Sequence, residues 1–173
     1  MDKIVFLDRD GVINKCAKPH EYIAKWEDFE FIDHVPEAIK LLNDACYKVV
    51  VISNQRCVAC GIATLEEVNA LHEKLNEVLA KSGAHIDAFY ICPHDIGTCK
   101  CRKPKIGLFL QAEQDFSVDK NRSYMIGDSE SDIIAGQRYG IETIFIGDRI
   151  IGDFQCGSLY EATKNILKKD TVT

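Results

Sequence analysis

The fold is decided near the N-terminus by IVFLDRDGV (residues 4–12), where a short apolar run ends in two acidic residues. Four apolar residues without polar alternation are typical of a strand that is buried on both faces of a parallel sheet. Asp8 and Asp10 follow the run directly, and Gly11 allows a sharp turn. Residues i and i+2 of an extended chain point to the same side, so both carboxylates can face one cleft.

Four more apolar runs of this kind follow along the chain. They are KVVVIS (48–53), AFYI (88–91), YMIG (124–127) and TIFIG (143–147). Helical patterns occupy the segments at 35–45, about 64–81, 106–116, 130–139 and 158–168. The second of these helices should begin with a capping box made by Thr64 and Glu67.

Strands that alternate with helices predict an α/β fold with three layers. A central, mostly parallel sheet should be joined by right-handed crossovers and covered by helices on both faces. We expect one domain over residues 1–173, with its core at about 3–147 and a C-terminal helix at about 158–168.

Composition narrows the class of protein. The net charge of -6 argues against nucleic acid as a partner, because phosphate backbones attract the opposite charge. No apolar run approaches the ~20 residues that span a bilayer, and the acidic N-terminus is not typical of a signal peptide. We therefore expect a cytoplasmic monomer that acts on a small molecule and binds no membrane.

Polar residues follow the apolar runs, where the carboxyl ends of parallel strands bind ligands. Ser53, Asn54 and Gln55 follow the second run, and Asp128 and Asp132 follow the fourth. Carboxylates that approach closely repel one another unless a cation joins them, and the oxygen-preferring Mg²⁺ fits this group. The alternative is a set of aspartates that cap loops and helices, but the joint pattern is more specific than any one motif.

In chain order, four motifs resemble those of the haloacid dehalogenase superfamily of phosphatases. They are DRDGV (8–12), SNQ (53–55), the lysine of CRKP (101–104) and GDSESD (127–132). The resemblance covers about residues 3 to 147. It implies a Rossmann-like fold and a Mg²⁺-dependent phosphomonoesterase that acts through an aspartyl-phosphate intermediate.

The same resemblance implies the residues that carry the chemistry. Asp8 would attack phosphorus, while Asp10 would protonate the leaving alkoxide and later take a proton from water. Mg²⁺ would be held by Asp8, the Asp10 carbonyl and Asp128. Ser53 would hydrogen-bond the phosphoryl oxygens, and Lys103 would neutralise charge on the nucleophile and on the transferred group.

Further residues are assigned from their places in these motifs. Asp132 is expected either to orient Lys103 or to support the magnesium through a bound water. Substrate contacts are expected from Asn54, Gln55, Arg56 and Arg102.

The segment CPHDIGTCKCRKPK (92–105) carries a second candidate metal site. Cys92, His94, Cys99 and Cys101 would saturate a tetrahedral Zn²⁺, which makes the site structural. Eight cysteines could also indicate disulfides, but a chain of this size without an export signal favours metal binding or plain burial of the thiols. We expect the zinc to order the loop that presents Lys103, since ordering a loop costs ~1–2 kcal/mol per residue.

The Cys/His pattern directly before CRKP resembles one branch of the superfamily, which contains heptose bisphosphate phosphatases and histidinol-phosphate phosphatases. That likeness implies removal of the 7-phosphate from D-glycero-D-manno-heptose 1,7-bisphosphate, a step of cell-surface polysaccharide synthesis. Histidinol phosphate is the alternative substrate. A basic lip made by Lys100, Arg102, Lys103 and Lys105 would suit a second anionic group on the substrate. Different classes of function stay open, namely a noncatalytic zinc-binding interaction protein and phosphoryl transfer to an acceptor other than water.

The spacing of the motifs leaves no room for a large cap domain between Asp10 and Ser53 or between Ser53 and Lys103. Specificity should then come from loops 14–32, 55–62 and 92–105. Cys57 and Cys60 form a C-x-x-C pair in the second loop, which could be redox-active or bind a second metal. With no further ligands available, we favour two unpaired thiols.

Overall fold

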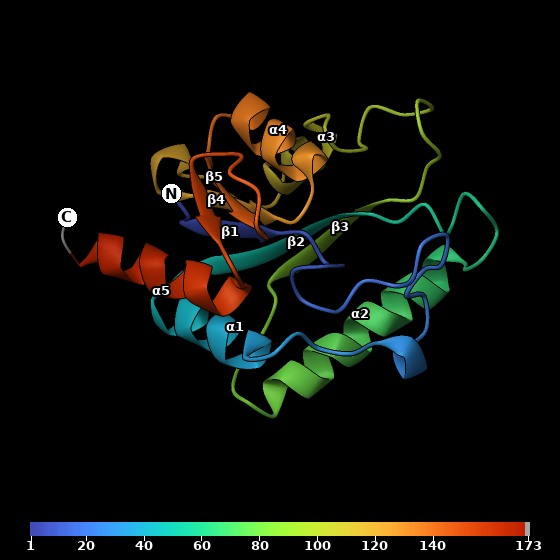
Figure 1. Ribbon diagram of the computed structural model, residues 1–173, viewed down its shortest axis with the longest axis horizontal. Coiled ribbons are helices and arrows are strands. Elements are labelled where there is room, and N and C mark those ends of the chain that lie inside the picture. Colours follow the sequence, from blue (N-terminus) through green and yellow to red (C-terminus); the bar gives the residue numbers. More distant parts are fainter. Residues whose placement is uncertain (172–173) are drawn as a thin grey trace.

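The computed structural model describes residues 1–171 and contains one sheet covered by helices on both faces (Figure 1). Its strands are β1 (Ile4–Leu7), β2 (Lys48–Asn54), β3 (Ala88–Cys92), β4 (Tyr124–Gly127), β5 (Glu142–Ile146) and β6 (Phe154–Cys156). Within the described chain the strand order is β3-β2-β1-β4-β5-β6, and every neighbouring pair is parallel.

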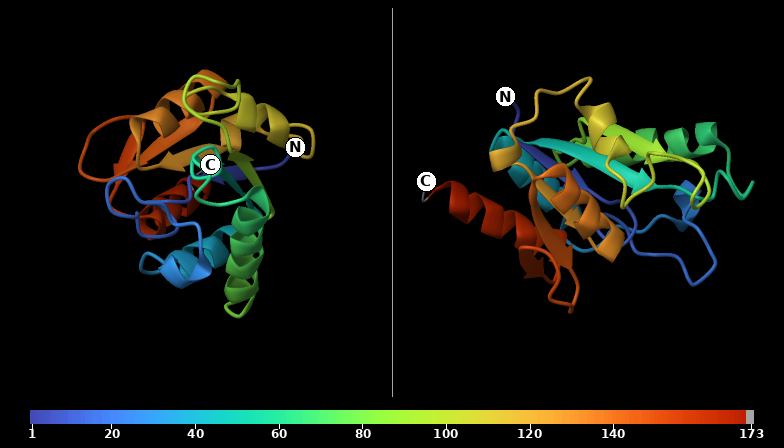
Figure 2. Two further views of the ribbon diagram at one scale, coloured as in Figure 1. Left: turned by 90° about the vertical axis from the view of Figure 1, so that its right-hand side faces the viewer. Right: turned by 90° about the horizontal axis from the view of Figure 1, so that it is seen from above.

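Two groups of helices cover the sheet. The helices are α1 (Val35–Asp44), α2 (Leu65–Ala80), α3 (Gly107–Ala112), α4 (Glu130–Tyr139) and α5 (Leu159–Asp170), with short 3-10 turns at η1 (Trp26–Asp28) and η2 (Lys120–Arg122). On β1, Val5 and Leu7 face the core under α1, α2 and α5, whereas Ile4 and Phe6 face the core under α3 and α4. The three layers are separate in Figures 1 and 2. The predicted α/β class is confirmed.

The structure contains the five strands and five helices that the sequence predicts, with α3 shorter than its predicted 106–116 segment. The predicted capping box is present, because Glu67 N donates to Thr64 Oγ1 at 3.1 Å and Thr64 N donates to Glu67 Oε2 at 2.8 Å. One strand was not predicted. β6 has only three residues, two of them exposed, so it lacks the continuous apolar run that marks a buried strand.

The strand order explains where a ligand can bind. From β1 the chain adds β2 and β3 on one side of the sheet, then crosses back to place β4 on the other side of β1. Such a reversal leaves a crevice outside the carboxyl ends of the strands. The loops after β1, β2 and β3 lie together at this end, on the right of Figure 1. The motifs after β1, β2 and β4 therefore converge there.

No large cap domain interrupts residues 1–171, in agreement with the prediction from motif spacing. Within the same described range, every helix is too short or too polar to cross a membrane.

Candidate active site

Three aspartates meet at the crevice. Carboxylate oxygens of Asp8, which follows β1, and of Asp128 and Asp132, from the end of β4 and the start of α4, all lie within 4.8 Å of one another. Gly11 makes this approach feasible. Its φ is +87°, and a Cβ there would lie 1.9 Å from Asp128 Oδ2. Only glycine fits both the turn and the contact.

Lys103 reaches into this acidic group from the loop after β3. Its Nζ lies 2.9 Å from Asp8 Oδ1, 2.7 Å from Asp132 Oδ1 and 2.7 Å from the Ile52 carbonyl oxygen. Burial would lower the pKa of this ammonium, but Asp132 and Asp8 outweigh burial and raise it. Lys103 is therefore a buried cation that is fully charged at neutral pH.

Asp132 contacts the lysine directly. Its Oδ1 pairs with Lys103, while its Oδ2 accepts from Ser129 Oγ at 2.7 Å and from Ser129 N at 3.1 Å. Both oxygens thus have protein partners at the start of α4. Asp132 fixes the lysine, and its carboxylate is less available to a cation than those of Asp8 and Asp128.

The remaining carboxylates fit a divalent cation. Burial, followed by the charge of Asp132, raises the pKa of Asp8 to about 7. The same two causes raise the pKa of Asp128 to about 6. Oxygen ligands whose ionised forms are destabilised by burial and by a neighbouring carboxylate are the donor set that Mg²⁺ stabilises.

Asp10 lies beside this group in a dense set of donors. Its Oδ1 accepts from Asn14 Nδ2 at 2.9 Å, and its Oδ2 accepts from Gln55 Nε2 at 3.1 Å. Gln55 Nε2 also donates to Ser53 Oγ at 2.8 Å. Arg9 donates to both Asp10 oxygens, at 2.9 and 3.2 Å. The structure thus joins Asp10 and Ser53, which the sequence predicts as catalytic residues, through the buried amide of Gln55.

Asn54 anchors the lysine loop. Lys103 N donates to Asn54 Oδ1 at 3.0 Å, and Asn54 Nδ2 donates to the Lys103 carbonyl at 3.2 Å. The side chains of Asn54 and Gln55, which the sequence predicts as substrate contacts, therefore bind protein groups in this structure.

The basic lip is smaller than the sequence suggested. Lys103 is buried, and Lys105 donates to the Cys99 carbonyl. Arg56, which was predicted to contact substrate, pairs with Asp95 at 2.6 Å. Arg102 is half-buried, and its Nη1 is itself buried, with no hydrogen-bond partner among the described residues.

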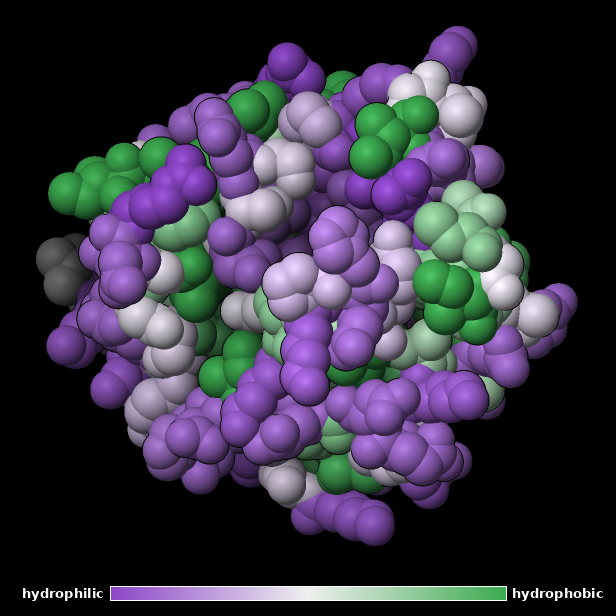
Figure 3. Space-filling model, turned by 45° about the vertical axis from the view of Figure 1, so that its right-hand side comes forward, coloured by the Kyte–Doolittle hydropathy of each residue, from purple (hydrophilic) through white to green (hydrophobic). Residues whose placement is uncertain are grey.

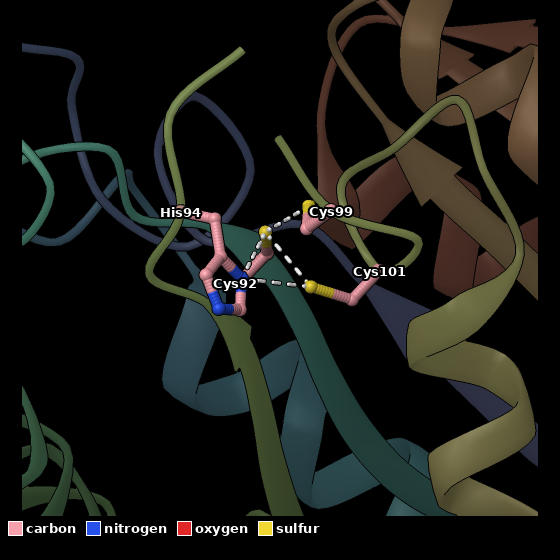
Figure 4. A group of neighbouring side chains, drawn as sticks. All are labelled: Cys92, His94, Cys99 and Cys101. Carbon is pink, nitrogen blue, oxygen red and sulfur yellow. Dashed lines mark hydrogen bonds between the residues drawn. The ribbon is translucent and has the colours of Figure 1, made fainter. Parts of the chain in front are cut away.

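The four predicted zinc ligands converge (Figure 4). Cys92 Sγ lies 3.0 Å from Cys101 Sγ and 3.4 Å from Cys99 Sγ, while His94 Nδ1 lies 3.2 Å from Cys101 Sγ. The sulfurs are too far apart for a disulfide, whose S–S bond is about 2.05 Å. Burial would raise the pKa of Cys99, but hydrogen bonds from the Arg102 amide and from Cys92 lower it to about 6. Three thiols and one imidazole within reach of a single centre fit tetrahedral zinc.

Cys57 and Cys60 differ in their surroundings. Cys57 is buried and donates to Gln55 Oε1 at 3.7 Å, whereas Cys60 is exposed and its Sγ lies 4.0 Å from the Tyr22 hydroxyl. Both thiols are free.

A cavity of about 570 Å³ lies mainly along the loop that follows β1. Cys16 lines it and lies 3.8 Å, Sγ to Oδ2, from Asp128. Other lining residues are Lys18, His20, Glu21, Tyr22 and Ile62. The side of the molecule that carries these loops comes forward in Figure 3, where mainly hydrophilic residues surround a hollow.

Three residues at the site escaped the sequence analysis. Arg9, Asn14 and His72 are buried and polar, and they form a chain of contacts around Asp10. Arg9 lies between the motif aspartates Asp8 and Asp10, and this position is the only feature of the sequence that could have identified it as a site residue. Asn14 lies in a loop, and His72 lies on the apolar face of α2, where a core histidine is the usual expectation.

Comparisons with known proteins agree with this geometry. The family model described as polynucleotide kinase 3 phosphatase matches residues 3–169. The D-glycero-beta-D-manno-heptose-1,7-bisphosphate 7-phosphatase of Haemophilus ducreyi is 38% identical over 149 residues, which cover 82% of this chain and 80% of that protein. The D-glycero-alpha-D-manno-heptose-1,7-bisphosphate 7-phosphatase of Campylobacter jejuni is 37% identical over 172 residues, which cover 97% and 98%.

A solved structure is also similar. It is a D,D-heptose 1,7-bisphosphate phosphatase from B. bronchiseptica, complexed with magnesium and phosphate. The TM-score is 0.88 at 27% identity, over 96% of this chain and 99% of that one. The predicted superfamily and the phosphatase class are thereby confirmed. This chain belongs to the haloacid dehalogenase superfamily of phosphatases, in the family that contains the D-glycero-D-manno-heptose-1,7-bisphosphate 7-phosphatases.

Proposed function

We propose that this phosphatase removes the 7-phosphate of D-glycero-D-manno-heptose 1,7-bisphosphate. The names of the relatives support this substrate. The observation that carries the chemistry is the buried contact between Asp8 and Lys103, 2.9 Å apart, beside the carboxylate of Asp128. A carboxylate that is oriented by a fixed cation at a strand end suits nucleophilic attack on a phosphate ester.

Asp8 is the proposed nucleophile. Lys103 engages its Oδ1, and no hydrogen bond among the described residues involves Oδ2, which is left to attack phosphorus. The P–O bond to the leaving group breaks as the bond to Asp8 forms, which gives an aspartyl-phosphate. Ser53 lies at the end of the neighbouring strand β2, from which it would hydrogen-bond the phosphoryl oxygens. Water then attacks phosphorus, releases inorganic phosphate and regenerates Asp8.

Asp10 is the proposed acid and base. Its carboxyl group would give a proton to the departing alkoxide in the first step and take one from water in the second. Magnesium, held by Asp8, Asp128 and the Asp10 carbonyl, would offset negative charge between the carboxylate and the phosphoryl group. The solved relative that carries magnesium and phosphate supports this choice of ion.

Zinc is the proposed structural ion of Cys92, His94, Cys99 and Cys101. Four ligands leave no open position for substrate, so the ion would order the loop rather than take part in the reaction. Lys103 follows two residues after Cys101, and Asn54 holds its backbone from the other side. Zinc and Asn54 would together fix where Lys103 points.

Arg102 is the proposed contact for the second phosphate. Its side chain is partly exposed and its guanidinium is a planar fork of donors that suits an anion, whereas Arg56 is engaged by Asp95. Histidinol phosphate remains the alternative substrate, but its cationic end would face Arg102 and Lys100. The net charge of -6 disfavours the polynucleotide named in the matching family description. A cytoplasmic location and a monomeric state stay predictions.

A substrate panel tests this proposal. The panel compares kcat/KM for both anomers of the heptose bisphosphate, for sugar monophosphates and for histidinol phosphate, with product analysis to separate free from transferred phosphate. We expect a bisphosphate to exceed the monophosphates by about tenfold or more, because one charge-assisted contact is worth ~1.5–3 kcal/mol. Arg102→Ala should remove most of that preference, while Lys105→Ala should keep it. Equal rates on mono- and bisphosphates, or a preference for histidinol phosphate, would contradict the assignment.

A further inference from the structure

Arg9 is an unusual feature of the site, because its charged side chain is completely buried. Besides its bonds to both Asp10 oxygens, its Nη2 donates to the Ile23 carbonyl at 2.5 Å. Ile23 belongs to the loop that follows β1 and lines the cavity. A buried cation destabilises a fold unless it is well paired, so the orientation of this guanidinium must be fixed.

His72 lies at the other end of the guanidinium. The imidazole is buried on α2 and stacks on Phe89, with ring centroids 4.4 Å apart and planes at 10°. Its Nε2 lies 3.3 Å from Arg9 Nη1. A guanidinium can only donate, so Nε2 must accept and the ring proton must be on Nδ1.

This tautomer is unfavourable for the ring itself. Nδ1 is buried, and no described residue gives it a hydrogen-bond partner. Burial, and then the charge of Arg9, lowers the pKa of His72 to about 3, so the ring is neutral. The neutral ring leaves its Nδ1–H unpaired while its Nε2 accepts a hydrogen bond from Arg9. This indicates that the contact with Arg9 selects the tautomer.

We propose that His72 is a positioning residue that holds Arg9, and through Arg9 holds the Asp10 carboxyl group where it meets the leaving oxygen. Asn14 and Gln55 each contact one Asp10 oxygen, whereas among the described residues Arg9 contacts both. This inference rests on the proposed function, in which Asp10 protonates the leaving group.

The chemistry of the first step gives a specific test. A departing alkoxide needs a proton from Asp10, whereas a nitrophenolate is stable without one. If Asp10 is misplaced, kcat/KM should fall for poor leaving groups and change little for good ones. A purely structural role of His72 would affect all substrates alike.

The experiment measures kcat/KM of holoenzyme for a series of aryl and alkyl phosphates that differ in leaving-group pKa. His72→Phe keeps an aromatic ring on Phe89 but removes the acceptor. We expect its kcat/KM to stay within about threefold of wild type on p-nitrophenyl phosphate and to fall tenfold or more on alkyl phosphates. A general acid typically supplies a rate factor of ~10²–10⁴, of which this loss is a part. His72→Gln places an amide oxygen near the position of Nε2 and should restore much of the alkyl activity.

Leu75→Ala is the matched control, since Leu75 is buried one turn further along α2. This substitution should lower the melting temperature without changing how kcat/KM depends on the leaving-group pKa. A uniform loss in His72→Phe, with the same dependence as wild type, would overturn the proposal. If His72→Phe does not fold, Arg9→Lys provides the same test. Lysine keeps the positive charge but lacks the planar guanidinium that contacts both Asp10 oxygens. A wild-type protein that releases phosphate neither from these esters nor from the heptose bisphosphate would instead overturn the proposed function, and this inference with it.

Discussion

At the scale of single residues, burial sets the protonation of the carboxylates at the candidate active site. The pKa of Asp8 is raised to about 7 and that of Asp128 to about 6, in both cases first by burial and then by Asp132. Both values lie above the ordinary carboxyl range, so folding favours the protonated forms. Without metal, these two groups therefore lower stability as the pH rises from about 4 through 7.

Magnesium should reverse this dependence, because it binds the ionised carboxylates and competes with protons. We predict that saturating Mg²⁺ raises the melting temperature strongly at pH 8 and progressively less as the pH falls through 7 and 6. Thermal unfolding with and without Mg²⁺ at each pH measures the effect. Asp128→Asn should lose most of the rise at every pH. An equal rise at pH 5 and pH 8 would show that these carboxylates do not hold the ion.

The sequence could place the motif residues but not the residues that orient them. Asp8, Asp10 and Asp128 follow apolar runs, and their position at strand ends is a local property of the sequence. Arg9 and His72 are 63 residues apart and meet only because α2 packs under the sheet. Contacts made by tertiary packing leave no pattern in a single sequence.

At the scale of elements, the loop after β3 links the zinc ligands to Lys103. The spacing of its cysteines predicted the ligand group, and the structure brings all four ligand atoms within 4.8 Å of one another. The basic lip is smaller than the loop's four cations indicate, because charge counting along the loop cannot show that Lys103 is buried or that Lys105 donates to the Cys99 carbonyl.

Cys99→Ser tests the loop. We predict loss of about one zinc per chain, a lower melting temperature and a fall in kcat larger than the change in KM, since Lys103 would no longer be held beside Asp8. Elemental analysis, thermal unfolding and steady-state kinetics provide the three measurements. Cys46→Ser, at an exposed cysteine, is the control and should match wild type. Unchanged zinc content and stability in Cys99→Ser would contradict the structural role.

At the scale of the whole molecule, the sheet continues beyond the core that the sequence predicted. β6 pairs with β5, and α5 packs on the same core as α1 through Leu159, Ala162 and Ile166. Continuous apolar runs in the sequence identify strands only as far as β5, because β6 is short and mostly exposed. We propose that residues after 147 belong to the folding unit.

Truncation after Gly147 tests that proposal. Each buried leucine or isoleucine of α5 contributes roughly 1.5–3 kcal/mol, and a domain of this kind has a total stability of only about 5–15 kcal/mol. The shortened chain should therefore lose cooperative thermal unfolding. A truncated protein that melts cooperatively near the wild-type temperature would place the boundary of the folding unit at 147.

The covalent step can be tested by trapping. Borohydride reduces an aspartyl-phosphate to homoserine. Enzyme that is quenched with borohydride during turnover can therefore be digested, and its peptides can be analysed by mass spectrometry. We predict homoserine at position 8, dependent on both substrate and Mg²⁺, and none in Asp8→Asn, which should fold but release no phosphate. Phosphate release by the wild type with an unmodified Asp8 peptide, or substantial turnover by Asp8→Asn, would contradict phosphoryl transfer to Asp8.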